Sequence, residues 1–523
     1  MQPSAKRRGM SLETLEERDN PSLGFGFTVG GDTSGTSQAL ALTTDAAGNS
    51  YITGDIVGTV HFGSTTVTAQ GKNDAYVAKY SPSGSLDWVD DIGGAGDGGG
   101  GDAIAVDASG NVYITGTFAG TNFNLDPNSP SHQFTSSTSG ADANAFVLKL
   151  NSSGQYVFGE VLGYGGSTDA AGIAVDASGN VYTTGQFLGT NVQFDPNTGG
   201  NHNLTSSSQG GNVYQNTYVS KLNSSGQYVY AVDIGYGNTR GTDPGGIAVD
   251  GSGDVYITGS FEGTNVNFDP NSTNHQLSSA QNGGGSTAYI SKLNPSGQYL
   301  FAVEMAAGSA ANGNSYGFSV ALDSSGDVYT TGQFAGTNLN FDPNSSNHQL
   351  SSATSNAYVS KLSSSGQYIF AVDLGAGGTA QPHDLVVDSS GNVYTSGYFY
   401  GTNLKFDPNS SNHTMSSSTS GSDINAYVSE LNASGQYVFA YSLGSGATEA
   451  FGDGVAVDAS GDVLVSGYFK SADANFDPFG MANLASPAGN YSFYLSKLAQ
   501  PTADGYQSLY AAPAYDYSYF AYI

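Results

Sequence analysis

The stretch Gly172–Phe187 reads GIAVDASGNVYTTGQF, and close copies of its centre, VDASGNVY, recur along the chain. In each copy a short apolar run ends at an aspartate, a turn follows, and a second run rich in β-branched and aromatic residues begins. Asp176 opens the turn with a side chain that can bond backbone groups ahead of it. Gly179 closes the turn at a position that tolerates positive φ. The stretch therefore predicts two short strands joined by a tight turn.

The repeat extends beyond this pair of strands. An insertion comes next, then a third strand at residues 217–222 (TYVSKL), an NSSG turn, and a fourth strand at 227–235. Seven copies occur at intervals of 62 to 74 residues, with the anchor aspartates at Asp45, Asp107, Asp176, Asp250, Asp323, Asp388 and Asp458. Four antiparallel strands per copy, each sheet buried against its neighbours, predict an all-β fold: a seven-bladed β-propeller.

The two ends of the repeat region complement each other. Residues 23–31, LGFGFTVGG, resemble a fourth strand alone, whereas the last copy has three strands and no fourth. We therefore expect the N-terminal strand to complete the last blade, with Phe25 and Phe27 in the sheet of Phe493 and Leu495, so that no sheet edge stays free. The predicted organisation is a leader or N-terminal arm at 1–21, a propeller at 22–499 and a tail rich in Tyr and Ala at 500–523.

The sequence IAVDASGNVYITG at 104–116, with DAYVAKYSPSG at 74–84, resembles the SBBP family of bacterial β-propeller repeats and, less closely, NHL-type propellers. The resemblance covers about residues 22–499. It implies a propeller in a secreted or cell-surface bacterial protein, usually without an assigned activity. Residues 1–21 hold four of the 14 Lys and Arg residues and no apolar core, so no standard signal peptide is visible. Because SLETLEERDNPS looks like a leader motif of large bacterial surface proteins, we expect an extracellular or cell-surface location.

Composition narrows the classes of partner. The 523 residues include 14 Lys+Arg and 44 Asp+Glu, which gives a formal charge of −30. Nucleic-acid binding is disfavoured because phosphate contacts need cations. The chain has no cysteine, which excludes disulfides and Cys-based zinc sites. No apolar run approaches the roughly 20 residues of a membrane span. We expect a monomeric propeller whose partner is a glycan or a surface protein.

The insertion raises the question of a metal site. Residues 268–277 read FDPNSTNHQL, and near copies occur in four other repeats. Pro after Asp fixes φ and Asn suits a turn, so we interpret the insertion as a turn with a half-buried His and predict no cofactor. The alternative is an ion, calcium above all, although one Asp with one Asn is a small oxygen set. The candidate ligands are Asp126, His132, Asp269, Asn271, His275, Asp342 and His348.

A repeated lysine and three irregular residues remain. The lysine on the third strand (Lys79, Lys149, Lys221, Lys292, Lys361 and Lys497, with Glu430 in the sixth copy) has two interpretations. In the first, the lysines form a cationic ring that binds an anionic ligand. In the second, the aliphatic stem of each lysine covers a Tyr of the fourth strand, and its ammonium group approaches the anchor Asp. We favour the second interpretation. Arg240, His383 and Glu449 break the repeat symmetry just before the first strand of three blades, so we place them on one rim.

No spacing supports a Ser-His-Asp triad or a catalytic carboxylate pair. The sequence therefore predicts a non-enzymatic binding or structural scaffold for a glycan, a peptide or a surface protein. The alternative is a propeller enzyme, a lyase or glycosidase, with its site at one mouth of the central channel.

Overall fold

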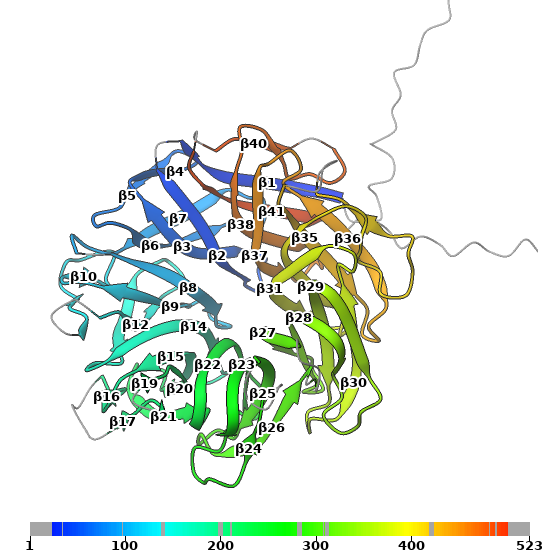
Figure 1. Ribbon diagram of the computed structural model, residues 1–523. Helices are drawn as coiled ribbons and strands as arrows, with labels where there is room; N and C mark the ends of the chain where they lie inside the picture. The colour runs from blue at the N-terminus through cyan, green and yellow to red at the C-terminus, as the bar shows by residue number, and fades with distance from the viewer. Residues whose placement is uncertain are drawn as a thin grey trace, which may run out of the picture.

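The computed structural model describes residues 24–499, with gaps at 34, 97, 138–141, 197–201, 210–211, 280–284, 307, 309–312, 418–422, 481 and 487–488. This region is a seven-bladed β-propeller, as the repeats predict. Each blade is an antiparallel sheet with four core strands, and the blades follow one another around a central axis (Figure 1). The proposed leader at 1–21 and tail at 500–523 lie outside the described residues.

The four strands of each blade are called a, b, c and d from the axis outward; they follow chain order in blades 1 to 6, whereas in blade 7 the N-terminal strand takes position d. Blades 1 to 3 are β2 (Thr36–Thr44), β3 (Ser50–Val57), β6 (Asp74–Tyr80), β7 (Leu86–Ile92); β8 (Gly98–Val106), β9 (Val112–Ala119), β12 (Asn144–Leu150), β13 (Tyr156–Leu162); and β14 (Ser167–Val175), β15 (Val181–Leu188), β20 (Asn216–Leu222), β21 (Tyr228–Ile234). Blades 4 and 5 are β22 (Tyr236–Val249), β23 (Val255–Asn267), β25 (Thr287–Leu293), β26 (Tyr299–Met305); and β27 (Asn314–Leu322), β28 (Val328–Asn340), β29 (Gln349–Leu362), β30 (Tyr368–Leu374). Blades 6 and 7 are β31 (Thr379–Val387), β32 (Val393–Tyr400), β35 (Asn425–Leu431), β36 (Tyr437–Leu443); and β37 (Glu449–Val457), β38 (Val463–Lys470), β41 (Ser492–Ala499), β1 (Gly24–Thr33).

The alternating direction of the strands gives the ring two unlike faces. The turns between a and b and between c and d lie on one face, which we call the turn face. The insertions between b and c lie on the other, the insertion face, together with the connections between blades. The insertions form small hairpins and ladders: β4 (Thr59–Phe62), β5 (Thr65–Thr68), β10 (Phe123–Asn124), β11 (Gln133–Phe134), β16 (Val192–Gln193), β17 (Asn203–Leu204), β18 (Ser208–Gln209), β19 (Asn212–Val213), β24 (Gln276–Leu277), β33 (Leu404–Lys405), β34 (Thr414–Met415), β39 (Ala474–Asn475) and β40 (Asn483–Leu484).

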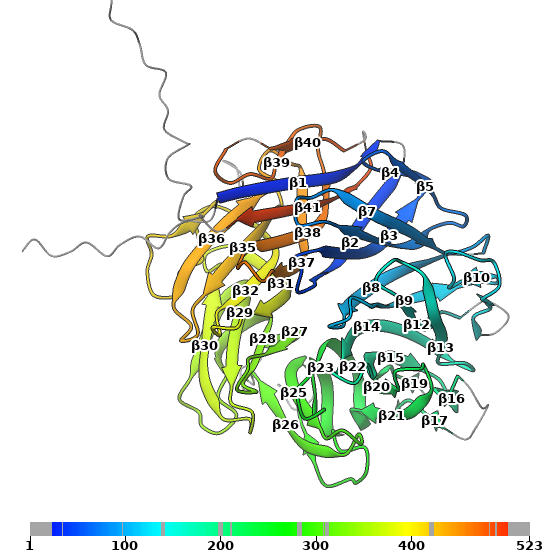
Figure 2. The same ribbon diagram turned by 180° about the vertical axis from the view of Figure 1, so that it is seen from behind.

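The N-terminal strand closes the ring, as predicted. β1 pairs antiparallel with β41, with Gly24 opposite Ala499 and Gly30 opposite Tyr494. Figure 2 shows β1 lying along β41 in the last blade. Phe25 and Phe27 thus belong to the sheet that contains Phe493 and Leu495. The closure joins the two ends of the repeat region through backbone hydrogen bonds and removes an open sheet edge.

The apolar core lies between blades and not within one sheet. Each cluster of buried side chains joins two neighbouring blades; one of them combines Tyr182 and Val219 of blade 3 with Ile257 and Tyr289 of blade 4. Each of these four residues has no exposed surface. Burial on both faces explains why strands b and c read as almost continuous apolar or β-branched runs. In the part of the chain that the structure describes, no helix is long and apolar enough to cross a membrane.

Candidate functional site at the central channel

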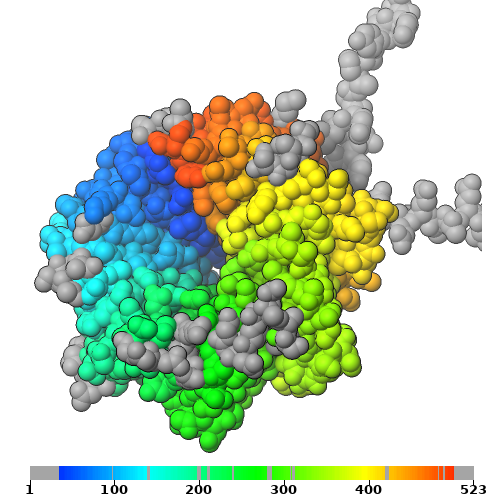
Figure 3. Space-filling view, viewed as in Figure 1, coloured from blue at the N-terminus to red at the C-terminus, as the bar shows by residue number. Residues whose placement is uncertain are grey.

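The seven inner strands surround a channel, and in the stretch that lines it the register of each with strand b of its blade shifts once. A cavity of about 420 Å³ lies on the axis and is lined by residues from β2, β8, β14, β22, β27, β31 and β37. The blades converge on this narrow centre in the space-filling view (Figure 3). A β-bulge leaves a residue without a cross-strand partner and turns its side chain away from the ladder. The residues at the register shifts that line the cavity are Leu40, Asp102, Ala171, Gly245, Gly246, Phe318, His383 and Asp453.

Nearer the insertion face, strands a and b of each blade present one cross-strand pair, which we call the mouth pair. The seven mouth pairs are Gln38–Asp55, Gly100–Thr117, Asp169–Gln186, Asp243–Ser260, Tyr316–Gln333, Gln381–Tyr398 and Phe451–Tyr468. The pairs differ from blade to blade although the surrounding strands are close copies. The mouth of the channel is therefore chemically asymmetric on a nearly symmetric frame.

One sector of the mouth is aromatic. Phe451 packs edge-to-face on Tyr398 of blade 6, with 5.1 Å between ring centroids, and stacks on Tyr468 at 4.8 Å. Tyr468 in turn meets Tyr491 edge-to-face at 5.1 Å. All four rings are half-buried, so each keeps some surface open to solvent. Offset-stacked and edge-to-face rings form a rigid apolar wall, and the tyrosine hydroxyls add polar groups to it.

The other sector is acidic. The pKa of Asp102 is raised to about 7, mainly by burial. The Thr117 hydroxyl, which donates to Asp102 at 3.0 Å, lowers the pKa, whereas the nearby carboxylates of Asp169 and Asp55 contribute to the rise. Burial also raises the pKa of Asp55 to about 6 and raises those of Asp169 and Asp243. The Gln186 amide donates to Asp243 Oδ1 at 2.5 Å. Neighbouring carboxylates raise one another's pKa, because each disfavours the charged form of the other. A sector of carboxyls also repels an anionic ligand.

At the cavity itself, polar side chains join neighbouring inner strands. His383 Nδ1 lies 2.5 Å from Asp453 Oδ1, which joins blades 6 and 7. Asp384 accepts a hydrogen bond from Ser319 Oγ of blade 5 at 2.9 Å and another from the Val455 backbone of blade 7 at 3.1 Å. Burial raises the pKa of Asp384 to about 6. Among the described residues, Asp453 lines the cavity, and its Oδ2 is buried without a hydrogen-bond partner.

The structure describes the side chains of two of the three rim candidates, His383 and Glu449. The expectation that all three precede the first strand is wrong, since Arg240, His383 and Glu449 lie within β22, β31 and β37. His383 faces the channel, whereas Glu449 contacts the hydroxyl of Tyr491 at the end of the aromatic sector. The side chain of Arg240 is outside those the structure describes. Of the three, His383 and Glu449 belong to the mouth but have different neighbours.

The FDPN insertions form closed loops, each with a His–Asp contact. In the blade 4 loop, Asp269 Oδ1 accepts the Asn271 backbone N–H at 2.9 Å, and Asp269 Oδ2 lies 2.9 Å from His275 Nδ1. The His275 ring stacks on Tyr299 of strand d, with centroids 4.1 Å apart. Asn271 thus reaches Asp269 through its backbone. The corresponding His–Asp distances are 3.1 Å for His132–Asp126, 3.0 Å for His202–Asp195, 3.0 Å for His348–Asp342 and 2.8 Å for His413–Asp407.

These loops bring together one Asp and one His each. In the described parts of the chain, no three His, Asp or Glu side chains converge in a group that could hold a metal ion. The Asp side chains are buried, whereas the His side chains are between 41% and 53% exposed. Each His therefore covers an anchored carboxylate and presents the rest of its ring to solvent.

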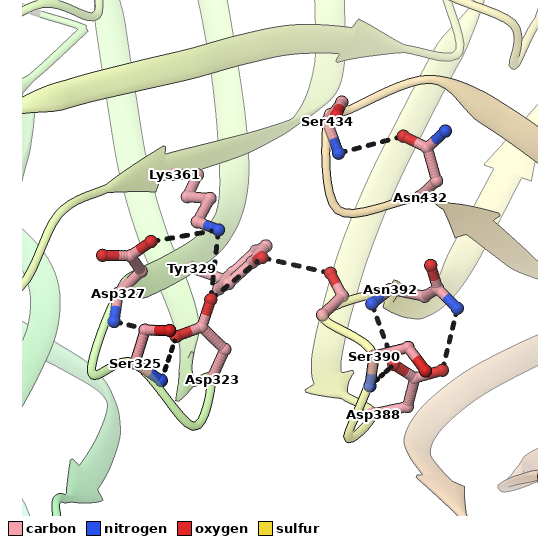
Figure 4. A network of polar contacts seen from close by, with 11 residues as sticks. Asp323, Ser325, Asp327, Tyr329, Lys361, Asp388, Ser390, Asn392, Asn432 and Ser434 are labelled. Atoms are coloured by element: carbon pink, nitrogen blue, oxygen red, sulfur yellow. Dashed lines mark hydrogen bonds and ion pairs between the residues drawn. The ribbon is translucent and has the colours of Figure 1, made fainter.

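The repeated lysines lie near the turns between strands a and b, and Figure 4 shows one of them, Lys361, beside the anchor Asp of its blade. Lys361 Nζ lies 3.0 Å from Asp323 Oδ2 and 3.1 Å from Asp327 Oδ2, and 4.6 Å from the centre of the Tyr329 ring. The head of the lysine is thus near the anchor Asp, as predicted. The Tyr under it belongs to strand b and not to strand d, so that part of the prediction is wrong. Strand d supplies the opposite neighbour, Phe370, across from Lys361.

Sequence reasoning missed the mouth pairs and the channel residues, including Asp102, Phe451 and Asp453. A signal was present, because strand a varies most between copies at the bulge and at the mouth pair. The variation shows which residues face the channel only when the register of strands a and b is known, because the bulge residue has no partner in strand b. The Tyr partner of each insertion His was also missed, although Gln-Tyr begins most d strands.

Known proteins resemble this chain only distantly. No protein-family model matches the chain, and no curated protein matches it. Among solved structures, the chain is similar to a polysaccharide lyase of family PL25, an ulvan lyase, with 10% identity, coverage of 89% of this chain and 96% of that chain, and a TM-score of 0.40. It is also similar to the β-propeller domain of the trilobed protease from Pyrococcus furiosus, with 6% identity, coverage of 86% and 96%, and a TM-score of 0.39. A third match is an acylaminoacyl peptidase from Pyrococcus horikoshii, with 10% identity, coverage of 84% of this chain and 50% of that chain, and a TM-score of 0.37.

Proposed function

We propose that this propeller is a binding module that recognises a neutral or amino-bearing glycan at the insertion-face mouth of its channel. The observation that carries the proposal is the placing of an aromatic sector opposite a sector of carboxylates and amides. A sugar ring has an apolar face of C–H groups and an edge of hydroxyls. Phe451 and Tyr468 offer a surface for the first, while Gln186, Asp243 and Asp102 offer partners for the second.

Charge supports the choice of glycan. The net charge of −30 and the acidic sector repel sulfated and uronate-rich chains. A neutral sugar meets no such repulsion, and an amino group gains from it. The cavity of about 420 Å³ beneath the mouth lies in the usual range of small-ligand sites, about 300–1,000 Å³. The setting we propose is the bacterial cell surface or its surroundings, in keeping with the resemblance to SBBP repeats; protease accessibility on intact source cells tests that location.

The experiment is a screen of neutral, amino and acidic oligosaccharides against the full chain, followed by calorimetric titration of those that bind. The test variants are Phe451→Gln and Tyr468→Gln, because Gln occupies the same positions in blade 6 (Gln381) and blade 3 (Gln186). Each variant introduces the residue that another blade of this propeller has at the equivalent position, so we expect little change in stability. We expect Kd to rise at least about tenfold, as for the loss of a central aromatic contact.

The matched control is Phe479→Ala, which removes an aromatic ring, 42% exposed, from an insertion outside the channel. We expect this variant to bind as the parent does. Binding that survives both glutamine variants, or that prefers acidic glycans, overturns the proposal.

The same mouth also supports a second candidate, a lyase or glycosidase. The specific observation is that Asp102 has a pKa raised to about 7 and that the His383–Asp453 pair lines the same cavity. A carboxyl that titrates near neutral pH is suited to act as a general acid or base. New reducing ends or unsaturated products on incubation with glycans, abolished in His383→Ala and Asp102→Asn, support this candidate over the non-enzymatic one.

A further inference from the structure

The insertion of blade 7 departs from the pattern of the others at two positions. Residues 476–484 read FDPFGMANL, whereas the insertion of blade 4 reads FDPNSTNHQL. Phe479 takes the place of the asparagine after the proline. The Phe476 N–H donates to the carbonyl of Ala482 at 3.1 Å, and His275 accepts the equivalent bond in blade 4, so Ala482 takes the place of the histidine. The loop of blade 7 therefore gains an aromatic ring and lacks the imidazole that covers the aspartate elsewhere.

Strand d of blade 6 departs from the repeat beside this loop. Tyr441 occupies a position that is valine in blades 3 to 5 (Val232, Val303 and Val372). The next residue, Ser442, replaces a carboxylic acid in the same blades (Asp233, Glu304 and Asp373). Tyr441 meets Phe479 edge-to-face, with ring centroids 4.9 Å apart and planes at 77° to each other. Departures from the repeat in two different blades thus contact one another.

These residues line a groove of about 550 Å³ between blades 6 and 7. Its volume is in the range of small-ligand sites, about 300–1,000 Å³. Phe479 is 42% exposed, so part of its ring is open to solvent. Among the described residues that line the groove, Asp477 is the one with a charged side chain, and none is Lys or Arg. The groove therefore combines an aromatic corner with a negative charge.

The carboxylate of Asp477 lacks a partner that its counterparts have. Asp477 Oδ1 accepts the Phe479 backbone N–H at 2.8 Å, which is the turn bond common to these loops. In the five loops with a histidine, the second carboxylate oxygen lies 2.8 to 3.1 Å from its Nδ1. With Ala482 in that place, Asp477 Oδ2 has no hydrogen-bond partner among the described residues. It is a charged acceptor without a donor.

A second acceptor without a donor belongs to Asn425, which also lines the groove. Asn425 is 1% exposed, and its Nδ2 donates to Ser442 Oγ at 2.9 Å. Its Oδ1 has no partner in the described part of the chain, whereas Asn216 Oδ1 in blade 3 accepts a backbone N–H at 3.2 Å. The amide of Asn475 supplies no donor, because its Nδ2 already donates to two backbone carbonyls. The groove is therefore short of donors.

We propose that this groove binds an organic ammonium group, with the Phe479 and Tyr441 rings beside its alkyl chain and the Asp477 carboxylate as its counter-ion. An ammonium group brings three N–H donors and no acceptor, which matches the groups left open here. A cation beside an aromatic ring is also attracted by the ring face. The net charge of −30 favours the approach of a cationic ligand. The groove shares no lining residue with the channel cavity, so this site does not depend on the glycan proposal.

The first test compares three small probes by calorimetric titration into the full chain: N-acetyl-lysinamide, its uncharged analogue N-acetyl-norleucinamide, and cadaverine. We expect both amines to bind, the norleucine compound to bind at least about tenfold more weakly, and amine binding to weaken as salt is raised. Tighter binding of the lysine compound points to a lysine of a partner protein as the source, and tighter binding of cadaverine points to a free amine. Equal binding of the lysine and norleucine compounds, or no binding of either amine, overturns the proposal.

The second test uses variants. We expect Asp477→Asn and Phe479→Asn each to raise Kd for N-acetyl-lysinamide at least about fivefold. Both should fold, because asparagine keeps the acceptor of the turn at 477 and is the residue of the other loops at 479. The matched control is Asp407→Asn, which removes the same charge from the blade 6 loop, where His413 lies 2.8 Å from the carboxylate. This control should bind as the parent does.

Two outcomes of the variant test contradict the site. An unchanged Kd in Asp477→Asn excludes the counter-ion, and an equal rise of Kd in Asp407→Asn shows that only the net charge of the protein matters. The result is also distinguishable from the glycan experiment. Phe479→Ala should lose the amine while it binds neutral glycans as the parent does, so either proposal can fail without the other.

Discussion

Replacing Lys361 by alanine should destabilise the propeller by about 2–3 kcal/mol. The Lys361 side chain is only 9% exposed, and its ammonium group neutralises Asp323 and Asp327 at 3.0 and 3.1 Å. Removing one partner of a buried ion pair costs about 3–5 kcal/mol, whereas an exposed pair contributes about 1 kcal/mol or less. Asp327 is 22% exposed, so water can partly rehydrate it and the cost falls between these limits.

The other blades supply the control. Where the fifth residue of the turn is asparagine, its amide holds the anchor carboxylate, as Asn180 Nδ2 does for Asp176 Oδ2 at 2.7 Å. We therefore expect Asp327→Asn to cost about 1 kcal/mol or less, because the new amide can donate to Asp323. In the Asp327→Asn background, Lys361→Ala should reduce stability by about 1 kcal/mol. The carboxylate at position 327 has been removed, and that of Asp323 accepts a hydrogen bond from the new amide. Urea denaturation of the four proteins gives the coupling energy, expected at about 1–2 kcal/mol. Equal costs of Lys361→Ala in both backgrounds would refute this account of the network.

Three further predictions follow from the fold, the insertions and the acidic sector. Deleting residues 24–33 should lower the Tm steeply and cause aggregation, because β41 becomes an unpaired edge; a deleted chain with the parent's Tm contradicts the closure. Asp269→Ala should reduce stability by about 1–2 kcal/mol, because a buried carboxylate that accepts two contacts within the loop is lost. His275→Gln should reduce it by about 0.5 kcal/mol or less, because the His275 ring is half exposed. Equal losses for the two variants in denaturant titrations would count against the role assigned to Asp269. The raised pKa of Asp102 means that the folded state binds a proton at this carboxyl more tightly than the unfolded state does. The stability that this proton contributes is full below about pH 4 and is lost as pH rises through about 7. Asp102→Asn should therefore flatten the fall of Tm between pH 5 and pH 8, and an unchanged pH profile would contradict the raised pKa.

Most of the fold could be predicted because its determinants are local and repeated. The anchor aspartate accepts the backbone N–H groups two and four residues ahead, as Asp176 does from Ser178 and Asn180, each at 2.9 Å. Gly179 has φ of 77°, which glycine adopts without strain. These interactions involve residues close in sequence, so a sequence pattern carries them. The closing strand could also be predicted from the sequence. The chain begins with a d strand that has no blade of its own, and the last blade lacks a d strand, so pairing the two completes the ring.

The candidate site could not be predicted in the same way. His383 and Asp453 are 70 residues apart and meet only because neighbouring inner strands lie side by side at the axis. Whether a residue faces the channel depends on the bulge in its strand, and a shift of one residue moves a side chain to the other face. The lysine prediction failed for a related reason. Strand c lies between b and d, so Lys361 has an aromatic neighbour on each side, and only the register shows that Tyr329 lies beneath its ammonium group.

The asymmetry of the mouth separates the requirements of folding from those of function. If the inner strands served packing alone, one solution repeated seven times would be enough, as it is for the anchor turns. The mouth pairs instead range from Asp169–Gln186 to Phe451–Tyr468 on strands that are copies of one repeat. The frame therefore tolerates several chemistries there, and packing does not require the aromatic rings of blades 6 and 7 to lie opposite the carboxyls of blades 1 to 4. A ligand with one apolar face and one polar edge is the simplest reason for that arrangement, because it needs both sectors at once.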